Sequence, residues 1–283
     1  MSDGARLGLF YTIIRPEEKA LLAAAEARGV PVVRLPDDEI TFGLEPESFG
    51  VDVVLDRSVS HTRALYASEF FAEYGLLPIN RPEVIERAGD KVLGSLRLRA
   101  RGIPTPKTVV ALSPEAALKA LERIGYPAVL KPPVGSWGRL MAKVGSREEA
   151  EQILEHKSAL EAPIHSIFYV QEYVPKPDRD LRALVVGDEV VAAMVRRSAA
   201  WRTNAARGAA VEPLVPAPEL AELALKAAEA MGGGVLAVDL MEASSGLVVH
   251  EVNPTPEFKA LAGVTGIDVA GKIVDYALTV GRR

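Results

Sequence analysis

The stretch "VHEVNPTPEFK", residues 249–259, ends a short apolar strand on a run of oxygen-bearing side chains. Glu251 and Asn253 are two residues apart, so they share one face of a strand. Two prolines, the carboxylate of Glu257 and then Lys259 follow. Because an unpaired carboxylate is costly to bury, a buried strand of this kind indicates a site that holds a cation.

The preceding strand completes this group of oxygen ligands. The segment "GVLAVDLMEASSGLVVHEVN", residues 234–253, predicts a hairpin with Ser-Ser-Gly in its turn. A hairpin centred near Ser245 sets Asp239 roughly opposite Glu251, and two opposed carboxylates repel each other unless a cation lies between them. Oxygen-only ligands suit Mg²⁺ or Mn²⁺ rather than zinc. An exposed acidic face without a metal is the alternative interpretation.

Magnesium that is bound through few carboxylates usually also holds substrate phosphates, so groups that bind phosphate are expected nearby. The chain has no G-x-x-x-x-G-K-[ST] motif, which argues against a P-loop. Lys131 ends the predicted strand "YPAVLK", Lys91 begins a predicted helix, and the loop "VGSWGR" (134–139) can present backbone N–H groups to phosphate oxygens. Taken singly, each lysine also fits a solvated surface charge. The spacing of "YVQEYV" (169–174) alone does not distinguish an adenine-binding edge from an ordinary amphipathic strand.

The order of predicted strands and helices divides the chain into three parts. Residues 1–85 alternate strands with helices, which predicts a small parallel α/β sheet. Residues 86–175 predict an α+β subdomain with two helices capped by Ser113 and Ser146. Residues 176–283 predict two hairpins, one closed by Gly187-Asp188, together with two helices.

Composition excludes several classes of protein. The chain of 283 residues contains no cysteine, which excludes disulfides, thiolate metal sites and a cysteine nucleophile. The net charge of −5 disfavours a general nucleic-acid surface, and no apolar run is long enough for a membrane span or a signal peptide. We therefore expect a cytoplasmic protein with no nucleic acid or membrane partner.

A local basic segment stands out in this acidic chain. The stretch "RRSAAWRTNAAR" (196–207) holds four arginines, which favours binding of acidic substrates, although a solvated loop is the alternative. Arg57 ends a predicted strand, where small α/β sheets place ligands, so it is expected to contact substrate. The four histidines show no metal-ligand spacing, and strand alternation predicts that His250 points away from the Glu251 face.

A set of motifs, in chain order, resembles the ATP-grasp superfamily in its RimK-like branch over essentially the whole chain. The set consists of Lys91, "VLKPPVGSWGR", "VQEYV", "RDLRALVVGD", "AVDL" and "HEVNPTPEF". The resemblance is closer still to the ligases of amino-group-carrier-protein biosynthesis, the LysX/ArgX type. It rests there on "NRPEVIERAGDK", "GSWGRL", "QEYVPKPDRDLR", "RRSAAWRTNAARG" and "EVNPTPEFK".

This resemblance implies an ATP-grasp fold, in which an N-terminal pre-ATP-grasp α/β domain (1–85) precedes two α+β subdomains (86–175 and 176–283) that enclose the nucleotide. It implies nucleotide contacts from Lys91, Lys131, Ser136, Trp137, Gly138, Gln171, Glu172 and Val174. Two magnesium ions, or manganese, would be held by Asp239, Glu251 and Asn253. The phosphate and acyl-phosphate end would be served by Arg182, Arg197 and Asn204. Substrate contacts are expected from Arg57, Arg196, Arg202, Arg207, Asn253 and Thr255.

The resemblance also implies a reaction. ATP would convert a carboxylate into an acyl phosphate, which an amine then attacks. In the resembling ligases the amine is that of α-aminoadipate or glutamate, and the carboxylate is the terminal glutamate of an acidic carrier protein similar to LysW. The resemblance to ligases of this type implies a homodimer or homotetramer. It also implies a role in lysine or arginine biosynthesis. A RimK-type glutamate ligase and a nucleotide-binding regulatory subunit without turnover remain alternatives.

Overall fold

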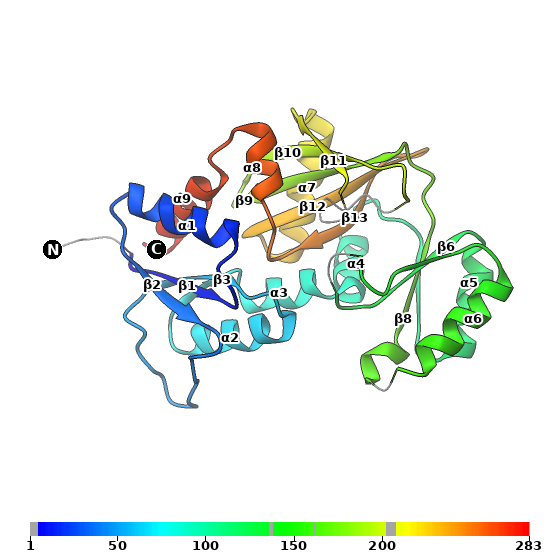
Figure 1. Ribbon diagram of the computed structural model, residues 1–283, viewed down its shortest axis with the longest axis horizontal. Helices are drawn as coiled ribbons and strands as arrows, with labels where there is room; N and C mark the ends of the chain where they lie inside the picture. Colours follow the sequence, from blue (N-terminus) through cyan, green and yellow to red (C-terminus); the bar gives the residue numbers. More distant parts are fainter. Residues whose placement is uncertain (1–4, 136–137, 161, 202–207, 283) are drawn as a thin grey trace.

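The computed structural model describes residues 5–135, 138–160, 162–201 and 208–282, and it contains three β-sheets (Figure 1). The N-terminal sheet lies at one end of the molecule and a four-stranded antiparallel sheet with its helices at the other. A five-stranded antiparallel sheet lies between them. This arrangement confirms the predicted combination of a parallel α/β unit with antiparallel α+β units.

The N-terminal sheet is parallel, with strand order β2-β1-β3-β4. Its elements are β1 (Leu7–Tyr11), α1 (Pro16–Ala27), β2 (Val32–Pro36), β3 (Val53–Arg57), α2 (His61–Glu73) and β4 (Leu77–Ile79). Pro16 begins α1 because its fixed φ suits the first helical turn, where its missing N–H is not needed. The carboxyl ends of the parallel strands lie at one edge of the sheet, and the residues after β3 reach the central cleft.

The four-stranded sheet at the other end of the molecule is antiparallel, with order β5-β8-β6-β7. Two helices lead into it, α3 (Pro82–Gly89) and α4 (Lys91–Ala100). The remaining elements are β5 (Thr108–Ala111), α5 (Pro114–Ile124), β6 (Ala128–Lys131), β7 (Ala142–Val144), α6 (Arg147–Ser158), the 3₁₀ helix η1 (Pro163–Ser166) and β8 (Phe168–Glu172). Ser113 and Ser146 accept the N–H groups that their helices leave unpaired, as predicted. Along β6, Ala128 and Leu130 face α5 and α6, so Val129 and Lys131 face the cleft.

The third sheet has order β11-β10-β9-β12-β13. Its elements are β9 (Arg179–Val186), β10 (Glu189–Arg197), β11 (Ala210–Leu214), α7 (Pro218–Met231), β12 (Val235–Ala243), β13 (Gly246–Asn253), α8 (Lys259–Thr265) and α9 (Val269–Val280). The sequence did not predict α3, β11 or α8. Helices α3 and α8 are only eight and seven residues long, too short for a clear apolar period.

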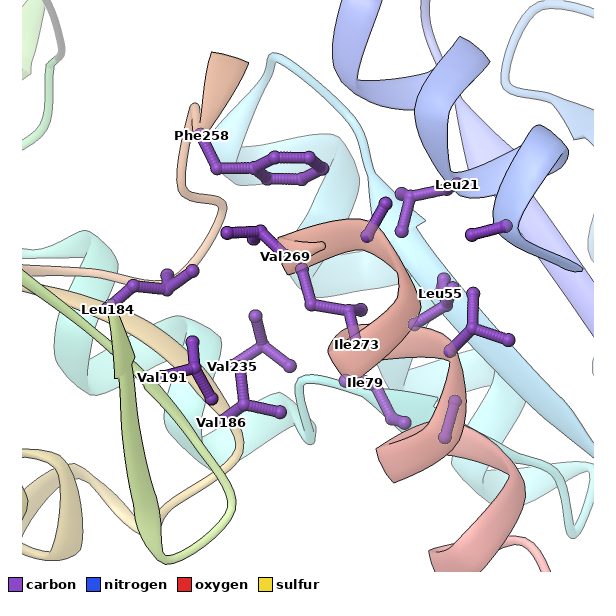
Figure 2. Packing of buried hydrophobic residues seen from close by; sticks show 14 of the residues in the cluster. Leu21, Leu55, Ile79, Leu184, Val186, Val191, Val235, Phe258, Val269 and Ile273 are labelled. Atoms are coloured by element: carbon purple, nitrogen blue, oxygen red, sulfur yellow. The ribbon is translucent and has the colours of Figure 1, made fainter. Parts of the chain in front are cut away.

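The last helix, α9, packs between the N-terminal unit and the five-stranded sheet. Val269 and Ile273 of α9 lie between Leu21 and Leu55 of the N-terminal unit and a group of side chains from the five-stranded sheet (Figure 2). That group comprises Leu184, Val186, Val191 and Val235. One continuous core therefore fixes the N-terminal sheet against the sheet that carries Asp239 and Glu251. Of the helices in the described part of the chain, none has the length and apolar character needed to cross a bilayer.

Candidate active site

A cleft of about 1230 Å³ lies where the three sheets meet. Side chains from the four-stranded antiparallel sheet, the five-stranded sheet and the loop after β3 all line it. It brings together most of the predicted site residues that the structure describes, which are Lys91, Lys131, Gly138, Gln171, Glu172, Val174, Arg182, Arg196, Asp239, Glu251, Asn253 and Thr255.

Asp239 is buried on β12 and pairs with two guanidinium groups. Arg182, directly opposite on β9, donates from Nε and Nη2 to the two carboxylate oxygens at 2.7 and 2.8 Å. Nη2 of Arg196 lies 3.3 Å from Oδ1 of Asp239. Burial alone would raise the pKa of Asp239, but the two arginines outweigh it and hold that pKa well below its usual range. The sheet therefore keeps this carboxylate ionised, as metal binding requires.

Glu251 lies directly opposite Asp239 across the β12–β13 ladder, as predicted. Its Oε1 is 3.4 Å from the Nζ of Lys91, which reaches in from the start of α4. Asn253 is on the same face and donates from Nδ2 to Oδ2 of Asp239 at 3.4 Å. The predicted metal ligands thus converge, and each of the two carboxylates has its own protein cation.

His250 forms a β-bulge that the sequence pattern did not reveal. The turn is Ser244–Ser245, and pairing runs regularly from Ala243 opposite Gly246 up to Leu240 opposite Val249. The next pair then skips His250. Because of this extra residue, His250 and Glu251 both line the cleft, so the prediction that His250 points away from the Glu251 face is wrong.

The bulge also explains why the predicted pairing of Asp239 with Glu251 is right although the turn is not centred on Ser245. A regular ladder from the observed turn would pair Asp239 with His250. Glu251 would then face the core side, where Val249 and Val252 pack. One inserted residue restores the pairing and turns the carboxylate toward the cleft.

Lys131 is almost fully buried, with 1% of its surface exposed. Its Nζ donates to Oε1 of Gln171 at 2.6 Å and lies 3.3–3.4 Å from the ring nitrogens of His250. Burial lowers the pKa of Lys131 to about 7, and the nearby Glu251 only partly offsets that effect. Burial and the positive charge of Lys131 together hold the pKa of His250 well below 6.5. A buried amine in this state gains its charge most readily when an anion binds beside it.

Lys91 and the glycine-containing loop are held together. Asp90 caps α4 by accepting the N–H groups of Val92 and Leu93, which fixes the start of the helix. The N–H of Lys91 donates to the carbonyl of Pro133 at 2.9 Å, and its Nζ donates to the carbonyl of Gly135 at 2.8 Å. The loop 134–139, which is predicted to bind phosphate, therefore begins after β6 and beside Lys91, the lysine predicted to bind the same phosphates.

The residues predicted to bind adenine lie on and just after β8, the strand whose Gln171 accepts a hydrogen bond from Lys131. Gln171 donates from Nε2 to the hydroxyl of Tyr169 at 3.0 Å, so its amide is used in orienting Lys131. The carboxylate of Glu172 accepts the backbone N–H of Lys107 at 2.8 Å. Both residues and Val174 line the cleft.

Two predicted site residues lie away from the cleft lining. Arg57 is buried, where it donates to Glu18 and to the carbonyl of Pro256, both at 2.9 Å, and so ties the N-terminal unit to the segment after β13. Arg197 is exposed at the end of β10 and pairs with Glu212 at 2.8 Å. The other predictions, Ser136, Trp137, Arg202, Asn204 and Arg207, lie outside the described residues.

Comparison with known proteins assigns this architecture. The description "RimK-like ATP-grasp domain" matches residues 88–277, and "LysX preATP-grasp domain" matches residues 7–87. The chain belongs to the RimK-like ATP-grasp family. Enzymes of this ATP-grasp family are ATP-dependent ligases that form C–N bonds with the help of a divalent metal ion.

Individual relatives agree with the RimK-like ATP-grasp assignment. The glutamate–LysW ligase ArgX of Sulfolobus acidocaldarius is 37% identical over 96% of this chain and 97% of its own length. The α-aminoadipate–LysW ligase LysX of Sulfurisphaera tokodaii is 34% identical over 95% of this chain and 96% of its own. The crystal structure of an ATP-grasp RimK domain protein from Sphaerobacter thermophilus superimposes with a TM-score of 0.80 at 28% identity, covering 97% and 100% of the two chains.

The donor set fits the divalent metal that RimK-like ATP-grasp enzymes use. Magnesium is typically held by one or two carboxylates plus substrate phosphates rather than by a cage of protein ligands. Asp239, Glu251 and Asn253 supply two carboxylates and one amide oxygen on one face. Across the ranges that the structure describes, no group of three histidine, cysteine, aspartate or glutamate side chains offers the alternative of a closed protein cage.

Sequence reasoning missed several residues that contribute to this ATP-grasp cleft, among them His250, Lys176 and Asp180. His250 supports Lys131, and Lys176 and Asp180 also line the cleft, 3.4 Å apart. Oδ1 of Asp180 accepts from Nε of Arg196 at 2.6 Å. Asp180 could have been found, because it lies two residues before Arg182 in "RDLR" and so shares its strand face. No sequence signal marked the His250 bulge.

Proposed function

We propose that this enzyme joins the α-amino group of α-aminoadipate, glutamate or both to the γ-carboxyl of a carrier protein's terminal glutamate. The carrier would be an acidic amino-group carrier similar to LysW, and the reaction would serve lysine or arginine biosynthesis. The observation that carries the proposal is that the N-terminal unit, whose sequence matches the LysX preATP-grasp domain, itself lines the cleft through Arg15, Ser58 and His61. Substrate specificity in this enzyme would therefore involve the unit that distinguishes LysX-type proteins.

The reaction has two steps. The carrier's γ-carboxylate attacks the γ-phosphorus of ATP, and the bond between that phosphorus and the oxygen bridging to the β-phosphate breaks. The products are ADP and an acyl phosphate on the carrier. The amino group of the amino diacid then attacks the acyl carbon, phosphate leaves, and the nitrogen loses a proton. No enzyme nucleophile is needed, in agreement with a chain that has no cysteine.

The residues of the cleft divide this work. Lys91 and Lys131 bind nucleotide phosphates, and Lys131 becomes fully charged when they arrive. Arg182 and Arg196 lie beside Asp239, where they stabilise negative charge that develops on the transferring phosphoryl group and on the tetrahedral oxyanion. Asp239, Glu251 and Asn253 would hold two magnesium ions, or manganese, and these ions would supply positive charge that offsets the charge of the phosphates.

The remaining predicted residues complete the proposal. Gln171, Glu172 and Val174 border the adenine and ribose, and Ser136, Trp137 and Gly138 cover the phosphates. Thr255, Arg202 and Arg207 contact the acidic substrates, and Asn204 serves the acyl-phosphate end. Arg57 acts indirectly by holding Pro256, and Arg197, which is exposed and paired with Glu212, is assigned no catalytic role. We expect a homodimer or homotetramer, which light scattering can measure.

ADP release tests the proposal. Purified enzyme with Mg-ATP should release ADP only when both the carrier and an amino diacid are present, and the carrier should gain the mass of that amino acid less water. A carrier whose terminal glutamate is changed to glutamine is the control and should support no ADP release. ADP release that is independent of the carrier but supported by another glutamate acceptor would instead identify the second candidate, a RimK-type ligase.

A further inference from the structure

Helix α4 carries an exposed face that the cleft does not use. Lys91 begins the helix in the cleft, and Gly94 and Leu98 are buried beneath it. Leu93, Leu96, Arg97 and Ala100 fall at helical spacing on the opposite side. Leu93 is 36% exposed and Leu96 61% exposed, so two large apolar side chains lie on the surface beside an arginine.

The segment that contains this face is also positively charged. Residues 91–107 contain Lys91, Arg97, Arg99, Arg101 and Lys107 and no aspartate or glutamate, which is a charge of +5. The whole chain has a net charge of −5, so the other residues together carry −10. Among the described residues, no carboxylate lies within ion-pair distance of Arg97 or Arg99, whereas Arg101 is 3.9 Å from Glu229. The two arginines nearest the exposed leucines thus carry uncompensated charge.

We propose that the α4 patch, defined as Leu93, Leu96, Arg97, Arg99 and Ala100, docks the folded body of the acidic protein substrate. This inference rests on the proposed function. Exposed leucines flanked by arginines can bury apolar area and pair with carboxylates at once, which suits an acidic protein. A second copy of this chain docking through the same patch would bring like charges together, which disfavours it as the occupant.

The position of the patch agrees with this role. At about 1.5 Å of rise per residue, Arg97 lies about 9 Å along the helix from Lys91, which reaches into the cleft. An extended peptide covers about 3.3 Å per residue, so a tail of a few residues spans from the patch to Lys91. The body of the carrier can therefore rest on α4 while its terminal glutamate enters the cleft.

The test compares two charge-reversal variants on the same fold. The double variant Arg97→Glu/Arg99→Glu alters the patch, and Arg34→Glu on the exposed edge strand β2, remote from α4 in Figure 1, is the control for a charge reversal elsewhere on the surface. Rates of ADP release are measured at low salt with the intact carrier and, separately, with a synthetic peptide of the carrier's C-terminal residues. We expect the double variant to raise the KM for the intact carrier tenfold or more. The KM for ATP, the kcat and the rate with the peptide should stay within twofold of the parent.

Each outcome bears on one statement. An unchanged carrier KM in the double variant, while the parent enzyme turns over, overturns the docking surface and leaves the proposed function intact. Equal losses of activity with the peptide and with the intact carrier also overturn the docking surface. The same holds if light scattering shows that the double variant has changed its oligomeric state. It also holds if the parent enzyme binds RNA and the double variant loses that affinity. A parent enzyme that does not use any carrier refutes the proposed function itself, and the docking surface with it. The milder variant Arg97→Gln/Arg99→Gln should show a smaller shift in the same direction.

Discussion

Asp239 and Glu251 lie directly opposite each other on β12 and β13, yet each carboxylate is paired with a different cation. Asp239 receives two hydrogen bonds from Arg182, and Glu251 lies 3.4 Å from Lys91. The cations that two opposed carboxylates were expected to require are therefore supplied by the protein itself. The guanidinium groups beside Asp239 and the ammonium group of Lys91 beside Glu251 already offset the negative charge of this face.

The first prediction concerns the substitution Glu251→Gln. It keeps the shape of the side chain but removes one metal-binding charge, so we expect turnover to fall by about 100-fold or more. Stability should change by no more than about 1 kcal/mol, because only the partly exposed pair with Lys91 is lost. Steady-state ADP release and thermal unfolding measure the two effects. Parental turnover at saturating magnesium would remove Glu251 from the metal site.

The second prediction concerns Lys131→Met, which preserves most of the side-chain volume at a buried position. A hydrogen bond to a charged group contributes about 1.5–3 kcal/mol, so we expect ATP affinity to fall about tenfold or more. Stability should hold or rise, because the variant no longer buries an ionisable amine. Calorimetric titration with ATP checks this, and an unchanged dissociation constant would show that Lys131 does not contact the nucleotide.

The third prediction concerns pH. The pKa of Lys131 is about 7 in the free enzyme, and nucleotide phosphates favour its protonated form, so ATP binding should raise that pKa. Above pH 7 binding must therefore take up a proton, and affinity should decline by up to about tenfold per pH unit. Below pH 7 the affinity should be nearly independent of pH. Calorimetry of Mg-ATP binding in two buffers of different ionisation enthalpy counts the proton, and Lys131→Met should abolish its uptake.

The fourth prediction compares two ion pairs of the same sheet. Asp239→Asn leaves the half-buried Arg182 and the buried Arg196 without their shared carboxylate, which should cost about 3–5 kcal/mol of unfolding free energy. Glu212→Gln breaks the exposed pair with Arg197 and should cost less than about 1 kcal/mol. Urea unfolding near neutral pH compares them. Because the pKa of Asp239 is depressed in the folded state, its contribution is present above about pH 3.8 and is lost as the pH falls further.

The fifth prediction concerns the size of the amino diacid. Gly263 of α8 lines the cleft, and a Cβ added there meets nothing within 4 Å. In the series Gly263→Ala and Gly263→Val, we expect kcat/KM for α-aminoadipate to fall more than that for glutamate, because the longer substrate needs more room. One methylene corresponds to about 1–3 kcal/mol of discrimination. Equal effects on both substrates would place the amino diacid elsewhere in the cleft.

Local patterns predicted much of the fold. The alternation of strands and helices in residues 7–79 and the helix caps Ser113 and Ser146 agree with the structure, because such features depend on short-range periodicity and backbone hydrogen bonding. Strand β11 and helix α8 escaped prediction. Both contact other elements of the C-terminal unit, and packing of that kind carries no local signature.

The candidate site divides in the same way. The sequence by itself determined the grouping of Lys91, Lys131, Asp239, Glu251 and Asn253, which line one cleft in the structure, because strand alternation and motif order constrain them. Only the tertiary structure decided which of the adjacent Arg196 and Arg197 enters the cleft, since successive residues of β10 face opposite sides and the neighbouring strands select the buried one. It also decided the orientation of Glu251. A single bulged residue reverses the face of every residue beyond it, and that choice rests on the pairing of β12 with β13, which no local pattern records.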